Sequence, residues 1–182
     1  TTSLSLGAPG RMGSRALGDA FSVHWTDTPM TYQSGPMACW AAAASMVVGW
    51  RDQQSIPDTV IAEKVGVFDA FNKGLYGRQR GYVADAWNLM AEAPASYTIE
   101  AWRDMLAANG PLYIDQALSI GDGGGSGGHV RVLVGMTSGG AADGSDTTMY
   151  MHDPARGPIK LSFADFLTFY EDRTRSTGGY LE

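Results

Sequence analysis

The sequence contains little cysteine, limited positive charge and no long apolar run, and each shortage excludes a class of protein. One cysteine in 182 residues allows neither an internal disulfide nor a multi-thiolate zinc site. Thirteen lysines and arginines against 19 acidic residues leave a net charge of −6, which argues against nucleic acid or an anionic membrane as a partner. The longest weakly polar run, Ala38 to Trp50, is too short to span a bilayer and predicts a buried helix.

Motifs for cofactors and metals are also missing. The three histidines and the cysteine are too widely separated to give metal-ligand spacing. The glycine-rich stretch 121–128 is not followed by the Lys-Ser/Thr pair of a phosphate-binding loop, so no nucleotide motif is complete. We therefore expect no metal and no cofactor, and a free thiol that suits a reducing compartment.

The length suits one domain, which we expect to span residues 21–182. Residues 1–20 are of low complexity and predict a linker or loosely ordered arm. The chain opens on Thr1 and shows no basic stretch followed by an apolar one, so no signal peptide is visible. These features favour a domain carried by a longer polypeptide.

Apolar residues recur at helical spacing in the first half of the chain and with a period of two in the second. Helices are predicted over Cys39–Arg51, Pro57–Val65, Tyr82–Ala93 and Thr98–Asn109, with an irregular, glycine-punctuated segment at 67–80. A short extended segment is expected within 21–32, strands at 111–116, 129–137, 147–152 and 159–161, and a last helix from Ser162. The fold class is therefore α+β, with a helical half packed on an antiparallel sheet.

The single cysteine lies where a nucleophile is expected. In Gln33-Ser-Gly-Pro-Met-Ala-Cys39, a turn sequence runs directly into an alanine-rich helix. Unpaired backbone N–H groups and the helix dipole at such an N-terminus favour a thiolate over a thiol. The alternative for Cys39 is a small, inert core residue.

A histidine and an aspartate in the second half supply the partners that a catalytic thiol requires. His129 opens a strand after the glycine-rich loop and is the candidate base; Asp153 ends the next strand and is the candidate group that orients the imidazole. His24 and His152 compete for the role of base, but His152 adjoins Asp153 on a strand, where neighbours point to opposite faces. Alternatively, His129 is a structural histidine and Asp153 forms a turn before Pro154.

Further residues could bind the substrate or stabilise the reaction. Gln33, six residues before the cysteine, is a candidate oxyanion donor, or else a solvated turn residue. Trp40 either contacts the substrate or packs behind the site. Gly127 and Gly128 end a loop that we expect to form a rim over the cleft, where a peptide backbone can approach closely.

Three segments together resemble the papain-like cysteine peptidases of bacteria: Gln33-x5-Cys39-Trp40, Gly128-His129-Val-Arg-Val-Leu-Val-Gly135, and Tyr150-Met-His-Asp153-Pro. The pattern is most similar to the peptidase domains of bacteriocin-exporting transporters and to the papain-like effector proteases of plant pathogens. The resemblance covers about residues 30 to 160. It implies a papain-like fold with Cys39 as nucleophile, His129 as base, Asp153 as orienting acid and Gln33 as oxyanion donor.

The resemblance also implies a biological setting. It implies a protease that cleaves a protein or peptide substrate, with cleavage next to small residues such as Gly-Gly. It also implies a role as a secreted effector or as a toxin in interbacterial competition. Such a domain would act in the cytoplasm of a target cell and have a cognate inhibitor protein. Two alternatives remain: a papain-fold amidase, transglutaminase or deamidase acting on peptidoglycan or glutamine, and a catalytically inert binding module.

Overall fold

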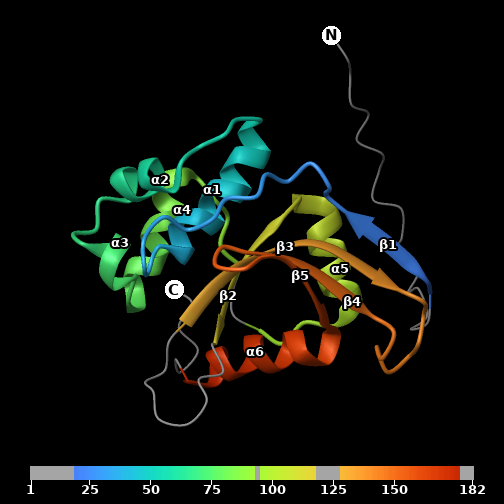
Figure 1. Ribbon diagram of the computed structural model, residues 1–182. Coiled ribbons are helices and arrows are strands. Elements are labelled where there is room, and N and C mark those ends of the chain that lie inside the picture. The colour runs from blue at the N-terminus through green and yellow to red at the C-terminus, as the bar shows by residue number, and fades with distance from the viewer. Residues whose placement is uncertain (1–18, 93–94, 118–127, 177–182) are drawn as a thin grey trace.

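The computed structural model describes residues 19–92, 95–117 and 128–176. Strand β1 (Phe21–His24) comes first, and the segment that follows it leads into helix α1 (Cys39–Asp52). Short helices continue this half of the chain: α2 (Asp58–Val65), α3 (Ala70–Lys73), the 3₁₀ helix η1 (Gly77–Arg80), α4 (Gly81–Trp87) and then α5 (Ile99–Asn109). Figure 1 shows α1 to α4 gathered on one side of the molecule.

The second half supplies most of an antiparallel sheet. Its strands are β2 (Leu112–Ala117), β3 (Gly128–Ser138), β4 (Thr148–Asp153) and β5 (Gly157–Ser162), and helix α6 (Phe163–Ser176) follows them. The strands are hydrogen-bonded in the order β1-β3-β4-β5. Strand β2 lies on the same edge of β3 as β1: β2 pairs with residues 128–133 of β3, and β1 pairs with residues 135–138. Strand β3 is thus the central strand, because it pairs with β1, β2 and β4.

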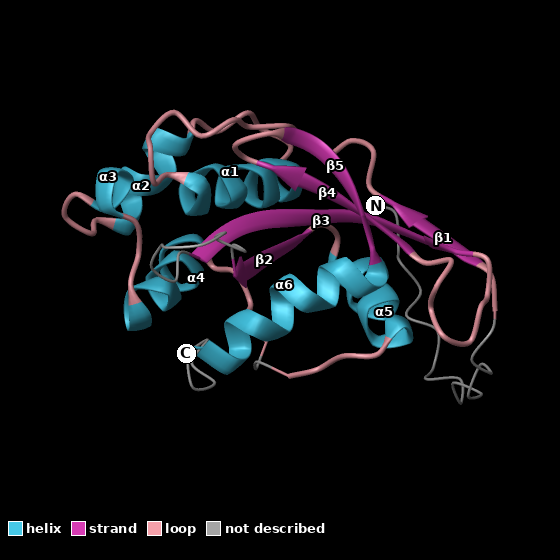
Figure 2. Cartoon of the chain, turned by 60° about the horizontal axis from the view of Figure 1, so that its bottom comes forward, coloured by secondary structure: helices cyan, strands magenta, loops and turns pink. Residues whose placement is uncertain are grey.

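Helices cover both faces of the sheet (Figure 2). Alternate residues of β3, among them Val130 and Val132, pack with α1 and α2 in one apolar cluster. Leu133 and Met136 join the opposite cluster, which includes Leu106 of α5 and Phe166 of α6. Side chains alternate between the two clusters up to Leu133, and an irregularity in the β3–β4 register between Leu133 and Gly135 shifts the alternation, so that Met136 joins Leu133. Because both faces of β3 pack against apolar clusters, nearly the whole strand is buried.

Helix α1 is the most deeply buried helix. Nine of its 14 residues are buried, including an unbroken run of small residues from Ala41 to Ser45. We expected one core-facing stripe, whereas burial extends around nearly the whole helix in its first half. Alanine side chains allow the helix axis to approach the sheet closely, and this packing fixes the position of the first residue, Cys39.

The structure confirms the α+β fold and the helix expected from Thr98, whose hydroxyl accepts a hydrogen bond from the Ala101 N–H at 3.2 Å. Two expectations for the helical half were wrong. Helix α4 ends at Trp87 rather than Ala93, because Asn88 adopts a left-handed conformation (φ 51°). The segment 67–80, expected to be irregular, contains α3 and η1, which are too short to give a clear apolar period.

Candidate active site

Cys39 is the first residue of α1 and is partly exposed. The preceding residue, Ala38, offers no capping side chain. In this position the Cys39 backbone N–H has no partner within the helix and the thiol lies at the positive end of the helix dipole. The turn that we expected does precede the helix, at residues 34–37, and the Ala38 N–H closes it by donating to the Gly35 carbonyl at 3.3 Å.

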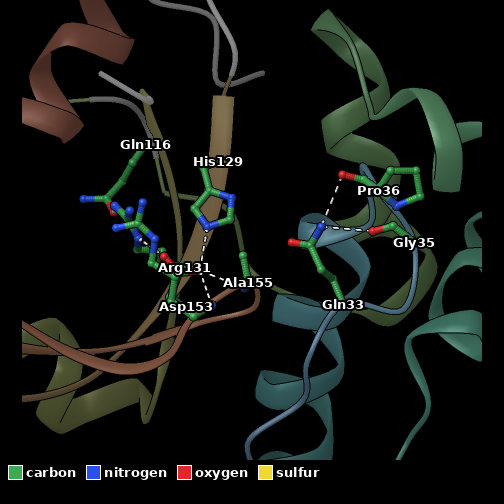
Figure 3. A network of polar contacts seen from close by, with 9 residues as sticks. Gln33, Gly35, Pro36, Gln116, His129, Arg131, Asp153 and Ala155 are labelled. Atoms are coloured by element: carbon green, nitrogen blue, oxygen red, sulfur yellow. Dashed lines mark hydrogen bonds and ion pairs between the residues drawn. The ribbon is translucent and has the colours of Figure 1, made fainter. Parts of the chain in front are cut away.

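His129 and Asp153 meet at the end of the sheet nearest to Cys39. His129 Nε2 lies 2.9 Å from Asp153 Oδ1, and both side chains are buried (Figure 3). Because Nε2 contacts the carboxylate, Nδ1 is the ring nitrogen left for the thiol. The three residues that the sequence singled out therefore converge from α1, β3 and β4.

The electrostatics favour a charged imidazole. Burial lowers the pKa of His129, but hydrogen bonds to Asp153 and to Cys39 outweigh burial and raise that pKa to about 9. Burial also opposes ionisation of Asp153, yet the hydrogen bonds from His129 and Arg131 hold its pKa well below the ordinary value. Near neutral pH the pair is thus an imidazolium beside a carboxylate.

A tight turn between β4 and β5 holds Asp153. Its Oδ1 accepts the Ala155 N–H at 2.8 Å, as an aspartate at the start of a turn does. The turn ends at Gly157, whose φ of 90° and close approach to Tyr32 leave no room for a side chain: a Cβ there would lie 2.7 Å from the tyrosine oxygen. Asp153 thus forms the turn that its position before Pro154 suggested and contacts the imidazole as well.

Gln33 links this turn to the nucleophile helix. Its backbone N–H donates to the Pro154 carbonyl at 2.9 Å, which joins the two halves of the site. Its side-chain Nε2 donates to the carbonyls of Gly35 at 2.9 Å and Pro36 at 3.2 Å. Gln33 Oε1 is buried and has no hydrogen-bond partner within the described residues, and Figure 3 shows the carboxamide across from His129. Donation to an oxyanion would require the carboxamide to rotate.

The other residues predicted to contact the substrate are Trp40, Gly127 and Gly128. Trp40 is 3 % exposed and donates from Nε1 to the Ala70 carbonyl at 3.1 Å, which favours packing behind the site over contact with substrate. Gly128 is the first residue of β3 and pairs with Ala117. Gly127 and the rest of the expected rim lie outside the described residues.

Sequence reasoning missed three polar residues that support the site. Arg131 donates from Nε to Asp153 Oδ2 at 2.7 Å and from a terminal nitrogen to Gln116 Oε1 at 3.1 Å. Asp58 accepts hydrogen bonds from the backbone and the hydroxyl of Ser34, and so anchors the turn that precedes the nucleophile. The position of Arg131 two residues after His129 was a usable signal, because such residues share a face of a strand. Nothing in the sequence indicated Gln116 or Asp58.

The side chain of neither rival histidine hydrogen-bonds to the Asp153 carboxylate in the described part of the chain. His24 is exposed on β1 and its ring lies 4.7 Å from the Tyr150 ring. His152 precedes Asp153 on β4, and burial lowers its pKa. The alternation of side chains along β4 separates His152 from the site, as expected.

The described residues form a pocket apart from the thiol, and they contain neither a metal-binding group nor a helix that could cross a membrane. The pocket, of about 390 Å³, is lined by residues of α1, α4, α5, β2 and the segment after α4, and neither Cys39 nor His129 lines it. No group of three or more His, Cys, Asp or Glu side chains in the described ranges is arranged to hold a metal ion. None of the helices in those same ranges is long and apolar enough to cross a membrane.

Comparisons with known proteins address the family of this chain. No curated protein gives a significant match to the chain. A family model described as papain-like cysteine protease AvrRpt2 matches residues 22–171, which include Gln33, Cys39, His129 and Asp153. The chain therefore belongs to the AvrRpt2 family of papain-like cysteine proteases, a bacterial effector family whose members hydrolyse peptide bonds.

Proposed function

We propose that this chain cleaves a protein substrate through a Cys39–His129–Asp153 triad, with Gln33 and the Cys39 backbone N–H as oxyanion donors. The observation that carries the proposal is the position of His129, which hydrogen-bonds to Asp153 through Nε2 at 2.9 Å and lies close enough to Cys39 for the thiol to raise the pKa of the imidazole. A base held by a carboxylate on one side and facing a helix-terminal thiol on the other is the arrangement that thiol catalysis requires.

In the proposed reaction the Cys39 thiolate attacks the scissile carbonyl carbon and forms a tetrahedral oxyanion. The His129 imidazolium donates its proton to the leaving amine as the C–N bond breaks, which leaves a thioester on Cys39 and a neutral imidazole. A water then loses a proton to His129 and attacks the thioester carbonyl. The C–S bond breaks, which releases the carboxylic acid and restores the Cys39 thiolate and the His129 imidazolium. Asp153 remains an anion throughout and keeps the ring oriented.

We further propose that the enzyme is delivered to a target cell and acts in its cytoplasm, where a free thiol stays reduced. A preference for small residues such as Gly-Gly at the cleavage site and a cognate inhibitor protein in the producing cell are parts of this proposal.

The test is digestion of a proteome-derived peptide library, with new N-termini identified by mass spectrometry. The wild type should generate termini that share a sequence preference, and Cys39→Ala and Cys39→Ser should generate none while melting at the wild-type temperature. Cleavage by Cys39→Ala would contradict the proposed nucleophile. Release of ammonia without new termini would instead identify a deamidase, and intact peptides with cleaved muropeptides a cell-wall amidase.

A further inference from the structure

The two carboxylate oxygens of Asp153 have different partners. Oδ1 accepts hydrogen bonds from His129 Nε2 at 2.9 Å, the Ala155 N–H at 2.8 Å and the Arg156 N–H at 3.3 Å. Oδ2 accepts from Arg131 Nε at 2.7 Å. We propose that Arg131 is a positioning residue of the catalytic site: it holds the second oxygen of Asp153, so that the first stays aimed at His129. This inference rests on the proposed roles of Cys39, His129 and Asp153.

Arg131 is itself fixed on several sides. It is 5 % exposed, donates to Gln116 Oε1 at 3.1 Å and places its guanidinium carbon 5.5 Å from the centre of the Phe169 ring on α6. Its place in β3, two residues after His129, puts both side chains on one face of the strand, toward Asp153. An arginine held in this way is a rigid donor, and its planar guanidinium fixes the orientation of a carboxylate better than an ammonium group could.

The catalytic cycle gives a reason for a second cation beside Asp153. His129 becomes neutral when it has delivered its proton to the leaving amine, and Asp153 is only 1 % exposed. A buried carboxylate that loses its counter-charge is strongly destabilised, because the low-dielectric surroundings no longer compensate its lost hydration. Arginine cannot lose its proton in a protein, so Arg131 compensates Asp153 at every stage, whatever the charge of His129.

Few other charges act on this carboxylate. Among the described residues, the charged side chains that contact Asp153 are His129 and Arg131, both from β3. The turn before β5 contributes backbone N–H groups, and β2 contributes the neutral Gln116 through Arg131. The partly buried ion pair of Arg80 with Asp115 joins η1 to β2. Burial raises the pKa of Asp115 while Arg80 and His129 lower it, whereas neither Arg80 nor Asp115 is among the groups that shift the pKa of Asp153.

The test compares Arg131→Met and Arg131→Lys with the wild type. The ¹³C carboxyl signal of Asp153, assigned with Asp153→Asn, is followed from pH 3 to pH 7. In the wild type it should not titrate in this range, because its pKa is held well below the ordinary value. Loss of the guanidinium in Arg131→Met should move the midpoint up into the range, and Arg131→Lys should reverse most of this shift.

Enzyme kinetics supply the second readout. The acid limb of kcat/KM for Arg131→Met should move to higher pH. By analogy with the loss of groups that orient metal ligands, kcat should fall about 10- to 100-fold. Arg103→Met is the matched control. Arg103 also pairs with a carboxylate, Asp104, and lies over a phenylalanine ring, but far along α5 from the site, so this variant should match the wild type in both readouts.

The outcomes separate the two proposals. An Asp153 titration and an acid limb that are unchanged in Arg131→Met would overturn the positioning role. If Arg131→Met does not fold, the Lys variant decides, because it must lose kcat at unchanged KM if guanidinium geometry matters, and equal kcat would overturn the role. A shifted Asp153 titration in an enzyme whose Cys39→Ala variant still cleaves peptides would contradict the proposed triad and leave the anchoring of Asp153 by Arg131 intact.

Discussion

Around Cys39 the chain packs small apolar side chains, whereas around His129 it buries charged ones. Ala38 and the alanines of α1 up to Ala44 are 0 % exposed, and packing against β3 positions the thiol. On the sheet side, His129, Arg131 and Asp153 are held by hydrogen bonds between 2.7 and 2.9 Å. The comparison teaches that shape positions the nucleophile and charge positions its base, so different substitutions should impair each side.

The largest effect is expected on the charged side. Asp153→Asn keeps the shape of the side chain but removes the anion that orients and stabilises the imidazolium. By analogy with the corresponding change in serine proteases, kcat/KM should fall about 10⁴-fold. Asp146→Asn is the control, since Asp146 is exposed in the β3–β4 connection and bonds to Ser138. Equal activities of the two variants, measured on one peptide substrate, would remove Asp153 from the triad.

Gln33 lies where the two sides meet, and Gln33→Ala tests its role as oxyanion donor. Loss of one such donor lowers kcat about 10²- to 10³-fold. The variant should change kcat more than KM, because the oxyanion exists only in the transition state and intermediate. Gln53→Ala, which removes an exposed glutamine at the end of α1, should have no effect. A Gln33→Ala enzyme with wild-type kcat would assign this residue to the turn alone.

A substitution in the closely packed helix α1 should lower the free energy of unfolding more than it lowers the rate of catalysis. Ala43→Leu adds volume where α1 has none to spare, and overpacking typically costs about 1–3 kcal/mol. Urea denaturation should show this loss in the free energy of unfolding. Ala107→Leu, on the exposed face of α5, provides the comparison and should change stability little. If both variants unfold at the same urea concentration, α1 is not packed as closely as its burial indicates.

The smallest effect is a pH dependence on the charged side. The pKa of His129 is raised to about 9, so the imidazolium that protonates the leaving amine is present below this pH and is lost above it. Activity should therefore fall about tenfold for each pH unit above 9, which corresponds to about 1.4 kcal/mol per unit. His152→Gln should retain the same basic limb in a kcat/KM profile. A limb near pH 6.5 would mean that Asp153 and Cys39 do not raise the pKa of His129.

Much of the site could be predicted because its residues carry local signals. A turn sequence followed by alanines predicted the start of α1 at Cys39, and the change of period predicted the strand that begins near His129 and the strand that ends near Asp153. The early end of α4 could not be predicted, since the left-handed conformation of Asn88 interrupts a pattern that continues to Ala93. The orientation of the Gln33 carboxamide depends on two carbonyl groups that only the folded turn brings together.

By itself, the sequence determined which residues could do chemistry, since it contains one thiol and places it at a helix start, and it determined the two periodicities that build the fold. The tertiary structure decided which groups meet. The β2–β3 register brings Gln116 beside Arg131, the β4–β5 turn holds Asp153 between two cations, and a hydrogen bond from Gln33 to Pro154 joins both halves. The physical reason is that helix and strand signals depend on neighbours in sequence, whereas the charge state of a buried group depends on neighbours in space.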